Sequence, residues 1–121
     1  AGEVVWVPNE ELLDAVTAVS GSGPAYFFLL MEHMTNTGIS LGLDPETSRK
    51  LTLQTAFGAS LMAQQSTETL TTLRQNVTSP GGTTEAAVNT MLELGMAETI
   101  ESALRAAQQR SVQLSQEFGD S

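Results

Sequence analysis

The feature that most constrains the fold is an uninterrupted apolar run from Ala25 to Met31, directly after Pro24. Proline is favoured in the first turn of a helix, so the run predicts a helix from Pro24 to about Thr37. In its first half this helix is apolar on nearly all sides, and such a helix is buried either in a core or in a subunit interface. Because spanning a bilayer takes about 20 apolar residues, we expect no membrane segment here.

The rest of the chain after Pro8 also has helical patterns, bounded by capping residues and glycines. The segments we expect are a first helix capped by Asn9 and ending at Ser20–Gly23, a third from Asp44-Pro45 to about Gln65, a short fourth capped by Thr67, a fifth opening at Thr83-Thr84 and ending near Gly95, and a last from Ala97 to about Glu117. The fold class is therefore all-α, a bundle of about six helices with one long buried member.

The first eight residues differ from the rest. Val4 to Val7 is a β-branched and aromatic run that ends at Pro8, which is typical of a strand. One strand is not stable by itself. We therefore expect residues 1–8 to be a remnant of a preceding domain and residues 9–121 to form the helical domain.

Charge and composition exclude several classes of function. The 14 acidic and 5 basic residues give a net charge of -9, and no basic stripe is present, so nucleic acid is not an expected partner. The chain has no cysteine, which excludes thiolate catalysis and is compatible with the cytoplasm. The single histidine, His33, has no second ligand at helical spacing, and we expect it to be structural and expect no metal site.

Two glycine-rich segments precede helix starts. Ser79-Pro80-Gly81-Gly82-Thr83-Thr84 contains the one Gly-Gly pair of the chain, and unpaired N–H groups at the following helix start would suit a carboxylate or phosphate. The alternative is a tight turn with a threonine N-cap. Neither this segment nor Ser20-Gly21-Ser22-Gly23 has the spacing of a P-loop or a dinucleotide fingerprint, so a dinucleotide would be held mainly by residues outside this chain.

These segments together resemble a known family. Ser20-Gly21-Ser22-Gly23-Pro24-Ala25-Tyr26 and Val77-Thr78-Ser79-Pro80-Gly81-Gly82-Thr83-Thr84, in this order and spacing, are similar to the C-terminal domain of pyrroline-5-carboxylate reductase. The resemblance runs over nearly the whole chain. It implies a helical domain like the C-terminal domain of 6-phosphogluconate dehydrogenase, an intertwined homodimer that assembles further into rings such as decamers, and a missing N-terminal Rossmann domain for NADPH or NADH.

The resemblance also implies the reaction and its residues. The family transfers a hydride to the C=N carbon of 1-pyrroline-5-carboxylate to give L-proline, the last step of proline biosynthesis. Thr84 matches the threonine that hydrogen-bonds the ring nitrogen. Ser79, Thr83 and Thr84 match the carboxylate-binding set, Gly81 and Gly82 shape the loop, and Ser20, Gly21 and Ser22 border the nicotinamide. The isolated chain is then expected to be inactive. The alternative function is a non-catalytic helical oligomerisation module.

Overall fold

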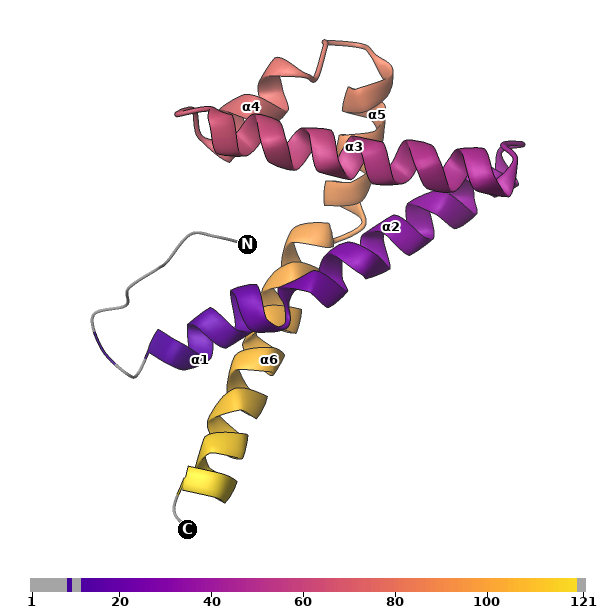
Figure 1. Ribbon diagram of the computed structural model, residues 1–121. Coiled ribbons are helices and arrows are strands. Elements are labelled where there is room, and N and C mark those ends of the chain that lie inside the picture. The colour runs from indigo at the N-terminus through magenta and orange to yellow at the C-terminus, as the bar shows by residue number, and fades with distance from the viewer. Residues whose placement is uncertain (1–8, 10–11, 120–121) are drawn as a thin grey trace. The chain divides into compact units, whose positions relative to one another are not determined.

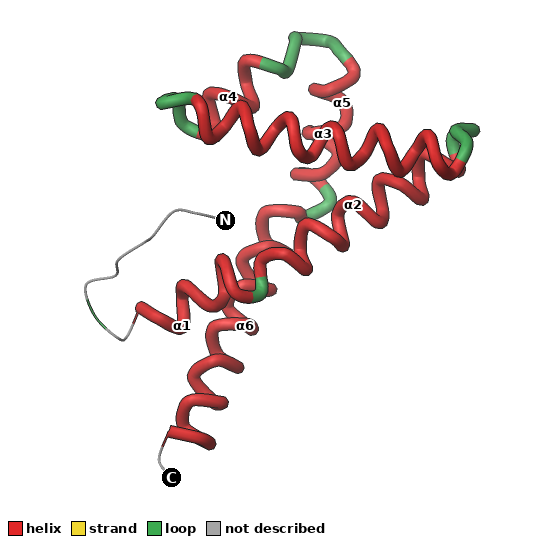
Figure 2. The backbone as a smooth tube through the Cα atoms, in the orientation of Figure 1, coloured by secondary structure: helices red, strands yellow, loops and turns green. Residues whose placement is uncertain are grey.

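The computed structural model describes Asn9 and residues 12–119, and every element in that part of the chain is helical (Figures 1 and 2). The elements are α1 (Leu13–Val16), the π-helix η2 (Thr17–Gly21), α2 (Gly23–Ser40), α3 (Pro45–Gln65), α4 (Leu70–Asn76), α5 (Thr83–Glu93) and α6 (Met96–Gly119). The all-α prediction is confirmed. The predicted count of about six differs because the first expected helix is divided into α1 and η2. The strand expected at residues 4–7, and with it the division at residue 8, lies outside the described residues.

Two helix starts show how local side chains set the helix boundaries. Asp44 accepts hydrogen bonds from the backbone N–H groups of Glu46 (3.1 Å) and Thr47 (3.3 Å), so α3 begins where the sequence predicted. The predicted cap of α4 at Thr67 is wrong. Thr69 takes this role, because its hydroxyl accepts from the Thr72 N–H at 3.1 Å.

The N-terminal helix differs from the prediction at its start and in the form of its last turn. Asn9 is not its cap: α1 begins at Leu13, with Leu12 in the capping position and no side-chain cap. The predicted stop at Ser20–Gly23 is confirmed, because η2 ends at Gly21 and α2 begins at Gly23. The helical path continues through η2, and only Ser22 separates η2 from α2. The last turn before this stop is a wider π-helical turn, which the sequence did not predict.

The chain divides into two compact units. The first holds α1, η2, the start of α2 up to Phe27, and α6; α1 and η2 pack against α6. Within it, Ser111 on α6 donates a hydrogen bond to the Asp14 carboxylate on α1 at 2.6 Å, and Ala18 in η2 is only 3% exposed. The second unit runs from Phe28 to Gly95.

In the second unit α2 and α3 meet through small side chains next to the turn that joins them (Figure 1). The buried Ser48 hydroxyl on α3 donates to the carbonyl of Thr35 on α2 at 2.8 Å. A Cβ added at Gly38 would overlap Ser48 Oγ and lie 3.4 Å from Leu43 Cδ1. Glycine is therefore required at position 38 for this close approach of the two helices.

The apolar half of α2 is not buried within the single chain. Phe27 and Phe28 are 63% and 66% exposed, and Leu29 is 55% exposed. The sequence predicted that this helix is buried either in the core or in a subunit interface. Burial in the core of a single chain is therefore wrong, and burial in a subunit interface stays a prediction. Among the described helices, none combines the length and apolar character needed to cross a membrane.

The contact at Gly38 gives a first prediction. Gly38→Ala should lower the free energy of unfolding by about 1–3 kcal/mol, the usual cost of overpacking a close contact. Removing Ser48 Oγ with Ser48→Ala should make the same Gly38→Ala change less costly, because the added methyl group would then meet the Cβ of residue 48 at 3.3 Å and Leu43 Cδ1 at 3.4 Å, without the overlap. Urea unfolding of the four proteins in this cycle measures the difference. An equal cost of Gly38→Ala in both backgrounds would contradict this account.

Candidate functional site

The segment from Ser79 to Gly82 forms a tight turn. The Gly82 N–H donates to the Ser79 carbonyl at 3.0 Å, and Gly81 has a φ of 74°. Proline at the second position and a positive φ at the third are typical of a type II turn, which favours glycine there. The tight turn that the sequence predicted is therefore confirmed, and Pro80 and Gly81 each have a conformational role in it.

The turn leads directly into α5, whose N-terminus has no side-chain cap. Gly82 is in the capping position, so the alternative of a threonine N-cap is wrong. The first helical bond runs from the Ala86 N–H to the Gly82 carbonyl at 3.3 Å, which leaves the preceding N–H groups of Thr83, Thr84 and Glu85 without an intrahelical acceptor. α3 and α4, in contrast, are capped by Asp44 and Thr69. The start of α5 can therefore offer N–H groups, those of Thr83 and Thr84 among them, to an anion.

A residue that the sequence analysis did not single out holds the turn in place. Glu85, in the first turn of α5, accepts a hydrogen bond from the Gly81 N–H at 3.0 Å. The signal was available, because a glutamate three residues after a helix cap often reaches back to backbone N–H groups. With its N–H engaged by Glu85, Gly81 shapes the loop, and the N–H groups of Thr83 and Thr84 remain for a ligand.

The hydroxyl groups of the predicted site face solvent to different degrees. Ser79 and Thr83 are exposed and Thr84 is half-buried. Within the described part of the chain, no hydrogen bond engages any of these three hydroxyls. The structure thus brings together, at one turn and one helix start, all the predicted substrate-binding residues: Ser79, Gly81, Gly82, Thr83 and Thr84.

The residues expected near a nicotinamide, Ser20, Gly21 and Ser22, lie in the other unit, in and directly after η2. The Ser20 hydroxyl donates to the Val16 carbonyl at 3.0 Å, and the Ser22 N–H donates to the Thr17 carbonyl at 2.9 Å. Ser20 and Gly21 are exposed. The backbone here is therefore ordered by its own hydrogen bonds while its outer surface stays open.

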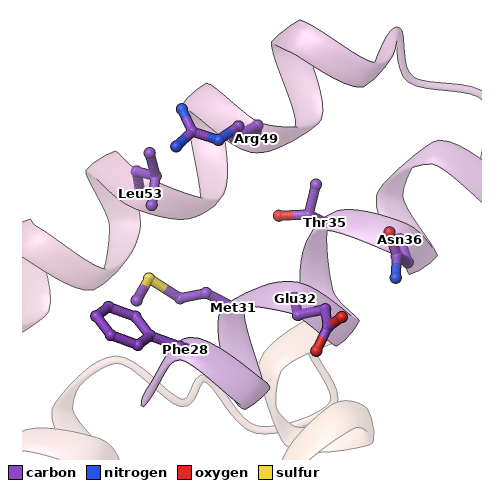
Figure 3. Close-up of a pocket in the computed structure, with 7 residues that line it drawn as sticks. All are labelled: Phe28, Met31, Glu32, Thr35, Asn36, Arg49 and Leu53. Carbon is purple, nitrogen blue, oxygen red and sulfur yellow. The ribbon is translucent and has the colours of Figure 1, made fainter. Parts of the chain in front are cut away.

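A concavity that the sequence did not predict lies between α2 and α3 in the second unit (Figure 3). It has a volume of about 330 Å³. Phe28 and Met31 line it from α2, and Leu53 and Arg49 line it from α3. Its walls are mainly apolar, so it is suited to another apolar surface more than to a small anion.

Metal ligation finds no support in the described residues, because no three histidine, aspartate or glutamate side chains gather there. His33 lies on α2 and is exposed. At the predicted site, the described residues offer hydrogen bonding from backbone N–H groups and hydroxyls.

Solved structures similar to this chain have the same fold. The chain matches a pyrroline-5-carboxylate reductase from Coxiella burnetii at 44% identity, with a TM-score of 0.90 over 93% of this chain and 42% of that one. It also matches the Plasmodium falciparum pyrroline carboxylate reductase with NADP bound, at 35% identity and a TM-score of 0.82, over 85% of this chain and 39% of that one.

Curated relatives agree with this likeness. The chain is 53% identical to pyrroline-5-carboxylate reductase of Pseudomonas aeruginosa over 118 residues, and 44% identical to that of Haemophilus influenzae over 114 residues. These matches cover 98% and 93% of this chain, but only 43% and 42% of the relatives' length. The family model for pyrroline-5-carboxylate reductase dimerisation matches residues 10–114. The chain therefore belongs to the pyrroline-5-carboxylate reductase dimerisation family.

Proposed function

We propose that this chain is the dimerisation and substrate-binding domain of a pyrroline-5-carboxylate reductase, an oxidoreductase that reduces 1-pyrroline-5-carboxylate to L-proline with NADPH or NADH. The observation that carries the proposal is the uncapped start of α5 after the Ser79–Gly82 turn, inside the region that the family model matches. Backbone N–H groups at a helix start favour a carboxylate, and the substrate carries one.

In this proposal the N–H groups of Thr83 and Thr84 and the hydroxyl of Ser79 bind the substrate carboxylate. Holding the carboxylate fixes the five-membered ring and orients its C=N bond. The hydroxyl of Thr84 hydrogen-bonds the ring nitrogen. When the carbon of the C=N bond accepts a hydride, the π electron pair moves to nitrogen, which must hold a proton to become the amine. A positioned hydroxyl at that atom lowers the barrier to this transfer.

The cofactor, when bound, supplies the hydride. The described residues contain no strand followed by a glycine-rich turn, and so do not fit the phosphates of a dinucleotide. We therefore propose that the cofactor is held mainly by a Rossmann domain outside this chain. What the chain offers is the exposed Ser20 and Gly21 with the half-buried Ser22, as a border for the nicotinamide. The NADP in the similar Plasmodium falciparum structure supports a nicotinamide cofactor.

The exposed apolar face of α2 and the concavity between α2 and α3 support the proposal of an intertwined homodimer. Phe27 and Phe28 are more than half exposed on a helix that has few charged residues, and the apolar side chains of Met31 and Leu53 line the concavity. Burying such side chains gains about 1.5–3 kcal/mol each. A second copy of the chain would bury them. Further assembly of dimers into decamers is proposed from the family resemblance alone.

Substitution of Thr84 in the full-length reductase that carries this domain tests the catalytic role. Thr84→Ala should lower kcat/KM by about tenfold or more, because the ring nitrogen loses its positioned hydroxyl. Thr84→Ser keeps the hydroxyl and serves as the matched control, which should retain most of the activity. Steady-state kinetics with 1-pyrroline-5-carboxylate measure both variants. If Thr84→Ala left the kinetic constants unchanged, Thr84 would have no part in the mechanism.

Binding of the product tests the anion site directly and separates the enzyme from a non-catalytic oligomerisation module. L-proline added to the isotopically labelled chain should shift the amide NMR signals of Gly82, Thr83 and Thr84. The amides of Glu46 and Thr47 provide an internal control, because Asp44 already occupies that helix start. Equal shifts at both helix starts, or no shift at the start of α5, would contradict the proposed anion site and favour the non-catalytic oligomerisation module.

A further inference from the structure

The π-helix η2 is held by a side chain that the proposed mechanism does not use. In η2 the Ser22 N–H donates to the Thr17 carbonyl at 2.9 Å, which is the i to i+5 pattern of a π-helix. Such turns are rare and are frequent at functional sites. This one contains Ser20 and Gly21, the residues expected to border the nicotinamide.

Tyr26, the single tyrosine of the chain, reaches back onto this turn from the first turn of α2. Its hydroxyl donates a hydrogen bond to the Ala18 carbonyl at 2.7 Å, and the bond is partly buried. A short bond of this kind, made across eight residues, joins the start of α2 to the first half of η2. This bond therefore holds the backbone of η2 at Ala18 against the start of α2.

Packing fixes the inner face of the same turn. Ala18 is 3% exposed, Gly23 is buried, and α6 packs against η2. The outer residues, Ser20 and Gly21, are exposed on this fixed base. A rigid base with an open outer edge is the arrangement expected where a planar group must be placed with sub-ångström precision.

We propose that Tyr26 is a positioning residue: its hydrogen bond to the Ala18 carbonyl holds η2 in the conformation in which Ser20–Ser22 border the nicotinamide. The inference rests on the proposed function, because it assigns this border to a nicotinamide cofactor. Tyr26 touches neither substrate nor cofactor in this account. Its effect passes through the backbone of η2, in the first unit, whereas the carboxylate site at α5 belongs to the second unit.

The test is Tyr26→Phe in the full-length reductase, because phenylalanine keeps the ring and removes only the hydroxyl. We expect the KM for NADPH to rise and kcat to fall, so that kcat/KM for NADPH drops by about fivefold, since a small misplacement of the reacting group is costly. The KM for 1-pyrroline-5-carboxylate should not change, because Ser79–Thr84 makes no hydrogen bond that involves Tyr26.

Ser111→Ala is the matched control. It removes another partly buried hydroxyl bond of the same unit, between α6 and Asp14 on α1, which does not involve η2. This variant should lower Tm and leave both KM values unchanged. If Tyr26→Phe changed the two KM values equally, or changed only Tm as Ser111→Ala does, Tyr26 would be structural and the proposal would be overturned.

Hydrogen exchange gives a readout that does not need activity. Peptides that cover residues 17–22 of the full-length protein should exchange several-fold faster in Tyr26→Phe than in the unsubstituted protein, while those that cover the Ser79–Thr84 loop should not. Unchanged exchange in η2 would overturn the inference even if proline formation is confirmed. An unsubstituted full-length protein that forms no proline would overturn the proposed function, and with it the assignment of this turn to a nicotinamide.

Discussion

The structure depends on an imbalance: the most apolar helix of the chain is exposed when the chain is alone. Phe27, Phe28 and Leu29 on α2 are all more than half exposed, while the described residues that are buried are small or polar, such as Ala18, Ser48 and Thr52. Hydrophobic burial is the main favourable term in folding, and small side chains contribute little of it. The remaining burial must come from contacts outside the single chain, and this is the physical basis of the proposed dimer.

The candidate site, by contrast, is defined by short-range contacts. Pro80, the positive φ of Gly81 and the Glu85 carboxylate fix the turn within a few residues of sequence. The N–H groups of Thr83 and Thr84 are left open because Gly82 has no side chain to cap them. A turn built in this way keeps its own geometry without contacts from distant parts of the chain.

This difference explains how much could be predicted from the sequence. The all-α class, the start of α3 at Asp44 and the tight turn at Gly81 depend on local propensity and capping, and all three were predicted correctly. The π-helical turn η2 was not predicted, because it depends on Tyr26 reaching the Ala18 carbonyl and on packing against α6. Glu85 was missed for a different reason. Its position in the first turn of α5 indicates a capping role, but only the structure shows that its carboxylate accepts from the Gly81 N–H.

The central claim is that a second copy of the chain covers the exposed apolar surface of α2. Sedimentation equilibrium of the chain across a range of concentrations tests this claim most directly. The account predicts a mass of twice the 12.8 kDa of one chain, and it predicts that Phe28→Glu shifts the equilibrium toward the single chain because a buried charge is costly. A 12.8 kDa species at every concentration, with cooperative unfolding, would contradict it.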